Sequence, residues 1–371
     1  MKVTLFEPPP KDPSKSHIEN ILELTPVSDF GPDVFTNTRP LWHPPGARGI
    51  YGGAAIAQCL AAAQLTVDPE FSPHSMHCYF VLAGDSEIPI IYHVERVREG
   101  RSFATRTVQA RQRGQPIFTT TISFDREGGG GKKKVEHSTK KPDVALPPSN
   151  GNTVDRGPFE TRRAGILNRT SPNAEQKAIH QFIRARGTIT GGRKAHLSAL
   201  AYMSDSYFIG TVARVQNIPR FASPSALKAA ICKLKNPSDL DIEEIERSTM
   251  ELARQEAAEF SAGYAQQHSD DTSHEPPREM GMMVSLDHTI YFHSRGGFRA
   301  DEWLFTEMTS PWAGDERGLV MQRIWAQDGT LVATCVQEVR TVESFPSTSP
   351  TLVPAGVVRL KQDSLNKATK L

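Results

Sequence analysis

Two stretches of this chain repeat one order of hydrophobic and polar positions, in which a long apolar segment is followed by shorter alternating runs. In the first stretch, residues 54–65 carry almost no charge, which predicts a helix that is buried on nearly every side. Strand-like runs follow this helix, with Gly-containing turns between them. They cover residues 75–83, 89–99, 101–113 and 116–124.

The second stretch has the same order of elements. Residues 176–185 precede another helix-like segment that is rich in small residues, at 195–208. The strand-like runs after it cover residues 283–293, 301–309, 318–326 and 330–342. One buried helix followed by an antiparallel meander is an α+β unit. The pattern therefore predicts an α+β protein of two tandem units, each with a central helix wrapped by an antiparallel sheet.

The segments between and around these units have a different composition. Pro and Lys are frequent near the N-terminus, a Gly and Lys run begins at Gly128, and an acidic amphipathic pattern covers residues 243–259. The first strand is expected within residues 18–30. The predicted division is a flexible tail at 1–19, a first unit at 20–126, a flexible linker at 127–173, a second unit at 174–342 with a helical insertion at about 223–278, and a C-terminal tail at 343–371.

Charge and cysteine content narrow the classes of partner. The 371 residues include 43 Lys and Arg against 42 Asp and Glu, so no overall field favours nucleic acid or an anionic membrane. The four cysteines are scattered among apolar neighbours without metal-ligand spacing, as in a reduced intracellular protein. Residues 1–15 contain no uninterrupted apolar run, so neither a signal peptide nor a membrane span is expected there.

Asp287 is the first candidate for chemistry. It lies in a strand-like run at 285–293, and Asp is depleted from strand interiors because its side chain competes for backbone hydrogen bonds. A solvent-facing strand surface would explain it. Alignment of the two repeats, however, sets Asp287 against Ser75 and Gln337 against Ile122. Two polar replacements in one copy suggest a site that is built on a shared scaffold.

Other catalytic patterns are missing from the sequence. It contains no G-x-S-x-G elbow, no H-E-x-x-H pair and no dinucleotide fingerprint, which leaves carboxylate chemistry as the main option for an enzyme. Gly52 and Gly53 come directly before the first central helix. They are explained either as a tight turn or as an anion or oxyanion site at the helix N-terminus.

The repeated helix and meander, together with several local motifs, resemble the type II acyl-CoA thioesterases, which are double hotdog proteins. In the first half the matching motifs are Gly52-Gly53, Gly84-Asp85-Ser86 and Gly114-Gln115-Pro116. In the second half they are Ser285-Leu286-Asp287-His288, Ser310-Pro311-Trp312-Ala313-Gly314, Gln327-Asp328-Gly329 and Val336-Gln337-Glu338. The resemblance covers about residues 20–126 and 175–342.

The resemblance implies a site in which an Asp, a Ser or Thr, and a Gln hold and activate one water molecule. By motif these are Asp287, Ser310 and Gln337, with Thr309 as an alternative hydroxyl. Either central helix could supply the oxyanion donors. His288 and His293 are interpreted as packing or surface residues. Asp205, near the end of the second helix, either supports the site from behind or is an ordinary helix-end carboxylate.

The function implied is hydrolysis of medium- to long-chain acyl-CoA to free acid and CoA, with no metal or organic cofactor. The alternatives are a hotdog-type enoyl-CoA hydratase, which would want a nearby His, and a non-catalytic acyl-CoA-binding double hotdog. A homo-oligomer through the hotdog sheets is possible for such a protein. The ending Thr369-Lys370-Leu371 is similar to the Ser-Lys-Leu peroxisomal signal, which indicates a peroxisomal location and otherwise a cytoplasmic one.

Overall fold

The computed structural model describes residues 3–41, 49–126, 135–148, 157–218 and 279–344. The predicted insertion at about 223–278 lies outside the described residues, and so do the linker glycines and the C-terminal Thr369-Lys370-Leu371.

The first unit contains one long helix and an antiparallel meander, as its hydrophobic pattern predicts. Its elements are α1 (His17–Leu22), β1 (Leu24–Pro26), η1 (Ser28–Phe30), β2 (Val34–Asn37), α2 (Gly52–Gln64), β3 (Phe71–Phe80), β4 (Ile91–Glu99), β5 (Phe103–Gln112) and β6 (Gln115–Arg126).

The second unit repeats this plan with a helix that is followed by strands. Its elements are β7 (Phe159–Leu167), η2 (Ala174–Gln176), β8 (Ala178–Ala185), α3 (Gly192–Met203), α4 (Thr211–Val215), β9 (Glu279–Ser285), β10 (Asp287–Phe292), β11 (Leu304–Gly314), β12 (Arg317–Trp325) and β13 (Leu331–Ser344).

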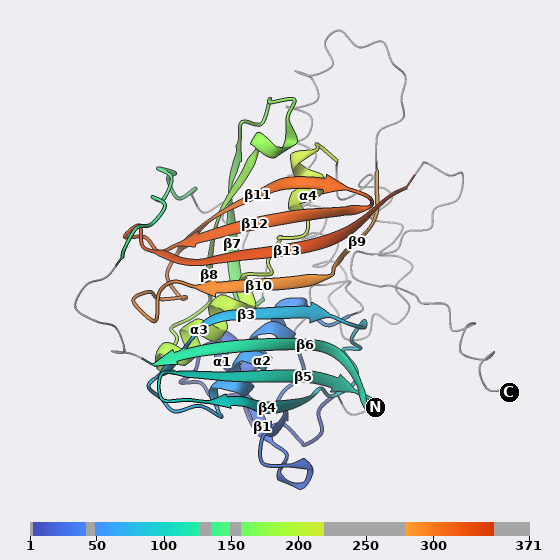
Figure 1. Cartoon of the computed structure of the whole chain (residues 1–371), viewed down its shortest axis with the longest axis vertical. Coiled ribbons are helices and arrows are strands. Elements are labelled where there is room, and N and C mark those ends of the chain that lie inside the picture. The colour runs from blue at the N-terminus through green and yellow to red at the C-terminus, as the bar shows by residue number, and fades with distance from the viewer. Residues whose placement is uncertain (1–2, 42–48, 127–134, 149–156, 219–278, 345–371) are drawn as a thin grey trace, which may run out of the picture.

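All these strands join one sheet (Figure 1). Its order is β1-β2-β4-β5-β6-β3-β10-β13-β12-β11-β8-β7, and β9 pairs with β13. The strands follow in the same order on each side of the β3–β10 contact. Next to β3 come β6, β5 and β4, and next to β10 come the corresponding strands β13, β12 and β11. The predicted duplication is therefore confirmed, and the two units meet along β3 and β10.

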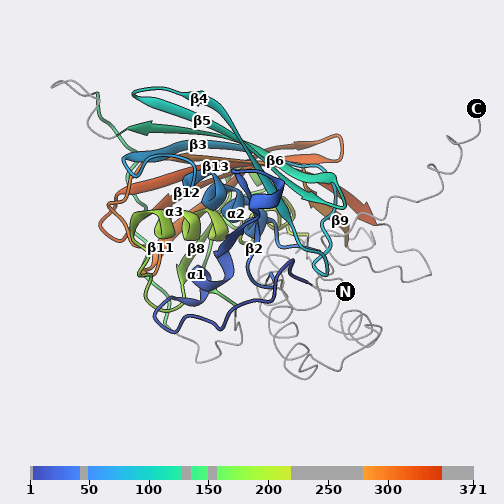
Figure 2. The ribbon, with the colours of Figure 1, turned by 90° about the horizontal axis from the view of Figure 1, so that it is seen from below.

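The two central helices lie on one side of the sheet (Figure 2). Ile56 and Leu60 of α2 are fully buried, as are Ala54 and Ala57, whose small side chains allow close approach to the surrounding elements. A hydrogen bond of 2.9 Å joins Gln64 Nε2 of α2 to Ser198 Oγ of α3. The helices therefore form a shared core in which the first unit's α2 contacts the second unit's α3 directly.

The first strand, β1, lies within residues 18–30 as predicted, but the segment directly before it was not predicted to be a helix. Residues 17–22 form α1 instead of a strand because Ser16 and Glu19 make a capping box, in which each side chain bonds the other's backbone N–H. The expected flexible tail is also held in place where it is described. The buried Arg39 side chain donates hydrogen bonds to the carbonyls of Pro9 and Pro10.

The predicted linker at 127–173 contains a strand. Residues 159–167 form β7, which pairs with β8 at the edge of the sheet. Arg162 and Arg163 lie in the middle of this strand. Their charges interrupt the hydrophobic pattern, so hydrophobicity alone does not predict a strand here. Both guanidinium groups lie over aromatic rings, Arg162 over Trp303 at 4.6 Å and Arg163 over Tyr207 at 5.5 Å. The exact bounds of the two units otherwise stay a prediction.

The run at 285–293, expected to be one strand, is interrupted at Leu286. Ser285 of β9 lies opposite Val339, whereas Thr289 of β10 lies opposite Val336. One additional residue therefore stands on the β9–β10 side, which is the arrangement of a β-bulge. The bulge changes which face the residues before it occupy, and this decides the composition of the site described below.

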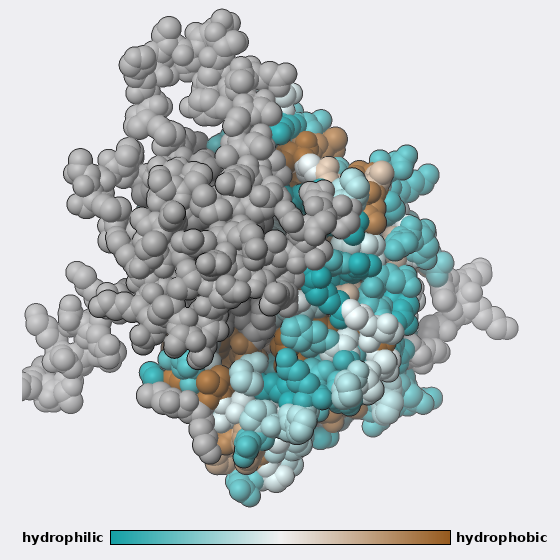
Figure 3. Space-filling view, turned by 180° about the vertical axis from the view of Figure 1, so that it is seen from behind, coloured by the Kyte–Doolittle hydropathy of each residue, from teal (hydrophilic) through white to brown (hydrophobic). Residues whose placement is uncertain are grey.

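Much of the described surface opposite to the view of Figure 1 is hydrophilic, with small separate apolar areas (Figure 3). Within the part of the chain that the structure describes, no helix has the length and apolar character needed to cross a membrane.

Candidate active site

A carboxylate of the second unit reaches the N-terminus of the first unit's central helix. Asp205 follows α3, and its carboxylate accepts a hydrogen bond from the backbone N–H of Gly53 in α2. A Cβ atom on Gly52 would lie 2.6 Å from Oδ2 of Asp205, and one on Gly53 would lie 2.2 Å from the carbonyl oxygen of Tyr202. Both glycines are therefore required for this close approach.

Gln337 connects Asp205 to a hydroxyl group. Its Nε2 donates hydrogen bonds to Oδ1 of Asp205 at 3.1 Å and to Oγ of Ser285 at 3.0 Å. The Gln337 side chain is fully buried, and its Oε1 has no hydrogen-bond partner among the described residues. A buried amide oxygen left in this state is a place for a water molecule or a substrate group. We call Asp205, Ser285 and Gln337 the Asp205 cluster.

The bulge at Leu286 places Ser285 in this cluster. Ser285 pairs with the fully buried Val339, so both side chains lie on the inner face of the sheet. An uninterrupted strand would have set Ser285 and Asp287 on the same face, as the alternation alone predicts. The bulge separates them.

Burial gives Asp205 the properties of a base. It raises the pKa of Asp205 from 3.8 to about 7, although hydrogen bonds from Gln337 and Gly53 oppose this rise. The side chain is only 9% exposed. A base works best when its pKa lies near the working pH, so Asp205 is suited to take a proton from water at neutral pH.

Asp287 lies elsewhere on β10. It pairs with Tyr79, whose side chain is 62% exposed, and is therefore on the outer face of the sheet. Its Oδ1 accepts a 2.6 Å hydrogen bond from the backbone N–H of Glu338, which lies next to Gln337 in the sequence. Partial burial raises the pKa of Asp287. The catalytic role of Asp287 stays a prediction.

Ser310 is buried in β11 on the same face as Met308, while Thr309 between them is only partly buried. The Ser310 hydroxyl donates a hydrogen bond to the carbonyl oxygen of Leu319 at 3.0 Å. The resemblance names Asp287, Ser310 and Gln337. Of these three residues, only Gln337 is hydrogen-bonded to Asp205 and Ser285. The role of Ser310 likewise stays a prediction.

The two units differ where the cluster forms. Met76 and Ile122 are opposite one another in β3 and β6, and both are fully buried. The matching positions of the second unit are His288 and Gln337, which are also fully buried. An apolar pair in one copy is thus a polar pair in the other. His293, by contrast, is a surface residue that bonds Thr334 Oγ1 at 2.8 Å.

Comparison with known proteins assigns the chain to a family. Residues 39–125 match the model of the acyl-CoA thioesterase N-terminal domain, and residues 136–341 match that of the C-terminal domain. Human acyl-coenzyme A thioesterase 8 is 30% identical over 356 residues, which cover 89% of this chain and 90% of the human protein. The chain belongs to the acyl-CoA thioesterase family. The predicted resemblance is confirmed.

Further relatives agree with this assignment. An acyl-CoA thioesterase II from Mycobacterium marinum has a TM-score of 0.57 and 28% identity, covering 90% of this chain and 99% of that one. The peroxisomal acyl-coenzyme A thioester hydrolase 1 of Saccharomyces cerevisiae is 24% identical over 87% of this chain and 93% of the yeast protein. This thioesterase-family chain therefore has the double hotdog fold that the sequence predicts.

Two members of the Asp205 cluster in this thioesterase-family chain were not chosen from the sequence. Asp205 was interpreted as a supporting or helix-end carboxylate, and Ser285 was considered only as part of a motif. A signal for Asp205 was available, since it comes shortly after the small and apolar residues 197–203 of the predicted helix. No linear pattern shows that this helix end meets Gly53 from the other unit.

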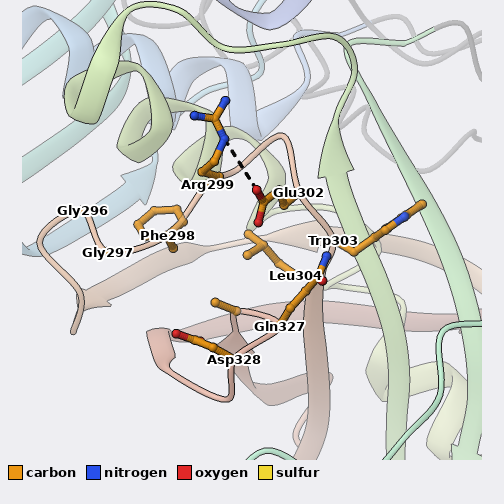
Figure 4. Close-up of a pocket in the computed structure, with 10 residues that line it drawn as sticks. Gly296, Gly297, Phe298, Arg299, Glu302, Trp303, Leu304, Gln327 and Asp328 are labelled. Carbon is orange, nitrogen blue, oxygen red and sulfur yellow. Dashed lines mark ion pairs between the residues drawn. The ribbon is translucent and has the colours of Figure 1, made fainter.

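A separate pocket of about 280 Å³ lies between the β10–β11 loop and the β12–β13 turn (Figure 4). Arg299, Glu302 and Asp328 line it, and Arg299 Nε is 3.8 Å from Glu302 Oε1. None of the Asp205 cluster lines this pocket. Within the described ranges, no three His, Cys, Asp or Glu side chains are grouped as metal ligands would be.

Proposed function

We propose that this protein hydrolyses acyl-CoA thioesters, with Asp205 as the general base, and that its substrates carry medium- to long-chain acyl groups. The observation that supports this most strongly is the pair of hydrogen bonds from Gln337 to Asp205 and Ser285. Membership of the acyl-CoA thioesterase family supports the reaction class. The acyl chain length follows from the resemblance rather than from a cavity.

In the proposed reaction, the Asp205 carboxylate takes a proton from a water molecule held by Gln337 Oε1 and the Ser285 hydroxyl. The water oxygen bonds to the thioester carbonyl carbon and forms a tetrahedral oxyanion. Collapse of this intermediate breaks the C–S bond, and the departing CoA thiolate takes the proton from Asp205. The products are a free acid and CoA, and Asp205 returns to its carboxylate form.

The N-terminus of α2 is the proposed source of oxyanion stabilisation. Gly52 and Gly53 begin α2 beside Asp205, whose carboxylate accepts the Gly53 N–H, and the N-cap residue Tyr51 makes no side-chain cap bond of its own. The positive end of the helix dipole favours negative charge at this place. This choice of α2 over α3 rests on the position of Asp205 at the start of α2.

A hydratase is the second candidate and would use a His as acid or base. His288 is the candidate, since its Nδ1 lies 4.0 Å from Oδ1 of Asp205. Burial lowers the pKa of His288 to about 3, which keeps the ring neutral at physiological pH. A ring that does not take up a proton is poorly suited to this chemistry, which favours hydrolysis.

The deciding experiment measures thiol release from a panel of acyl-CoA esters. A thioesterase releases CoA from saturated substrates, a hydratase modifies only the 2-unsaturated ones, and a binding protein modifies none. Asp205→Asn should lower kcat by about 10²- to 10⁴-fold. Binding of palmitoyl-CoA by purified wild-type protein without CoA release would rule out the proposed function.

A peroxisomal location is proposed for the whole protein. Support comes from the yeast relative, whose name places it in the peroxisome, and from the ending Thr369-Lys370-Leu371. A fluorescent protein that carries the last twelve or so residues should collect in peroxisomes. Diffuse fluorescence in the cell would contradict the role of this ending.

A homo-oligomer through the hotdog sheets is also proposed. The outer surface of β3 and β10 exposes Tyr79 and Tyr291, which are 62% and 43% exposed. Exposed aromatic side chains are common at protein interfaces. Light scattering of the purified protein should give more than one chain per particle, and Tyr79→Lys should reduce that number. A monomeric mass at micromolar concentration would contradict this proposal.

A further inference from the structure

Two apolar side chains that follow β3 are exposed beside the proposed site. Val81 and Leu82 are 47% and 43% exposed. Single exposed apolar residues are common on protein surfaces, but two consecutive ones next to a functional site form a patch that can meet a ligand. The reaction as written above gives these two residues no role.

Phe80, the last residue of β3, connects this patch to the start of α2. A Cβ atom on Gly52 would lie 3.0 Å from Cε1 of Phe80, so the ring lies against the helix N-terminus. The backbone N–H of Phe80 donates a 3.0 Å hydrogen bond to the carbonyl oxygen of Leu286, which directly precedes Asp287. Phe80 therefore borders both the N-terminus of α2 and the start of β10.

Ile50 continues the apolar surface on the side that precedes α2. Its side chain is partly buried and packs against the core. A Cβ atom on Gly84 would lie 2.5 Å from Cδ1 of Ile50 and 3.1 Å from Cδ1 of Ile117, so Ile50 lies on Gly84 beside β6. The name apolar rim is used below for the set Ile50, Phe80, Val81 and Leu82.

Hydrogen bonds fasten the loop of the apolar rim to the sheet. The backbone N–H groups of Val81 and Leu82 both donate to the carbonyl oxygen of Ile117, at 2.9 and 3.1 Å. Further along the loop, the Gln112 side chain accepts from the N–H of Asp85 at 2.9 Å and donates to the carbonyl oxygen of Asp85 at 2.8 Å. The two apolar side chains are therefore held at the surface by a fixed backbone.

The surroundings of the α2 N-terminus determine where an acyl chain can go. The chain is bonded to the thioester carbonyl carbon, so it leaves the site from the place where the carbonyl oxygen is bound, which is this helix end in the proposed function. The Asp205 cluster lies on one side of it and is polar. On another side, the Tyr51 ring is packed with the rings of Phe159 and Tyr202. The apolar rim offers exposed apolar side chains at the same helix end.

We propose that the apolar rim binds the acyl chain of the thioester, with the methylene groups next to the carbonyl against Phe80 and the more distant ones against Val81 and Leu82. This rests on the proposed thioesterase function, and it holds whether Asp205 or Asp287 is the base, because Phe80 borders both α2 and β10. Each methylene group that leaves water for an apolar contact tightens binding by up to about fourfold. The apolar rim therefore favours long acyl chains over short ones.

The test compares kcat/KM for dodecanoyl-CoA with kcat/KM for butanoyl-CoA, at concentrations at which neither ester forms micelles. A butanoyl chain ends beside Phe80, whereas a dodecanoyl chain continues over Leu82. In Leu82→Ser the dodecanoyl-to-butanoyl ratio should fall by about tenfold, because contacts with about two methylene groups are lost. Leu65→Ser is the matched control, since Leu65 is 60% exposed at the other end of α2, and it should keep the wild-type ratio.

Several results would overturn the proposal. They are an unchanged ratio in Leu82→Ser, an equal fall of the ratio in Leu65→Ser, or a loss in Leu82→Ser that is the same for both esters. A lower particle mass for Leu82→Ser in light scattering would also overturn it, because the apolar rim would then be a contact between copies of the chain.

A measurement on the wild-type protein covers the case in which a variant does not fold. The probe is a ketone analogue of dodecanoyl-CoA, which is not hydrolysed, with a photoreactive diazirine at the end of its chain. Irradiation should attach it to the loop at residues 81–88, as peptide mass spectrometry would show, and attachment elsewhere alone would overturn the proposal. Because this experiment needs no turnover, a wild-type protein that releases no CoA from any ester would remove the proposed function and leave the cross-link as a separate result.

Discussion

The side-chain nitrogen of Gln337 lies 3.1 Å from Oδ1 of Asp205, although 132 positions separate the two residues in the chain. The bond connects β13 to the residue that follows α3, at the point where α2 of the other unit begins. Each unit alone would lack part of this arrangement, since Gly53 comes from the first and Gln337 from the second. The site is therefore a property of the duplicated fold.

The two candidate carboxylates should respond differently to removal of charge. With Asp205 as the base, Asp287→Asn should keep kcat within about threefold of wild type, because Asp287 lies on the outer face opposite Tyr79. The prediction from the family motif is the opposite, a loss of orders of magnitude in this variant. Its stability should change by about 1 kcal/mol or less, since Asn also has an oxygen that accepts from the Glu338 N–H. Steady-state thiol release gives the comparison with Asp205→Asn. A loss of orders of magnitude in Asp287→Asn would return the role of base to Asp287.

The hydroxyl of the site can be identified with matched Ser→Ala changes. Ser285→Ala removes the group that accepts from Gln337 Nε2 and should lower kcat by about 10- to 100-fold. Ser310→Ala removes a buried bond to the Leu319 carbonyl and should cost about 1 kcal/mol of unfolding free energy while activity remains. The reverse pattern of activities would support the prediction made from the family motif.

Gln337 and Ile122 occupy matching positions of the two units and give a third comparison. Gln337→Ala should lower kcat by about 10²-fold or more, because the water loses its amide partner as it attacks. Ile122 is fully buried, so Ile122→Ala should destabilise the protein by about 2–5 kcal/mol with activity per folded molecule retained. Denaturant unfolding and thiol release on the same samples separate the two effects. A Gln337→Ala protein with wild-type kcat would contradict the proposed site.

The stability of the protein should depend on the protonation of Asp205. Its pKa in the folded protein is about 7, against 3.8 for the unperturbed group, so the folded state retains a proton that the unfolded chain loses as pH rises. The free energy of unfolding should therefore fall between about pH 4 and 7, by up to about 4 kcal/mol. Asp205→Asn should lose most of this dependence.

Asp287→Asn is the matched control for this measurement. Burial also raises the pKa of Asp287, but its side chain is only partly buried, so its removal should change the pH dependence much less. Urea unfolding at pH 4, 5.5 and 7.5 measures the effect. Parallel curves for wild type and Asp205→Asn would show that Asp205 is not held protonated by burial.

The sequence alone determined the architecture and the family. Hydrophobic periodicity is a local property, so the apolar segment at 54–65 and the alternating runs after it predict α2 and the meander without knowledge of the fold. The same order recurs in the second half, which reveals the duplication. Alignment of the copies also identified Gln337, because an amide at the position of Ile122 is conspicuous in an apolar strand.

Only the tertiary structure decided which residues surround Gln337. The bulge at Leu286 turns Ser285 to the inner face, and a one-residue change of register leaves no trace in a hydrophobic pattern of period two. From the sequence, Asp205 can only be interpreted as a supporting or helix-end carboxylate. Its hydrogen-bond partner Gly53 belongs to the other unit, and the two residues meet only when α3 packs against α2. Strand periodicity reports local environment, whereas a catalytic cluster depends on contacts between distant segments, and those contacts exist only after the two units have packed together.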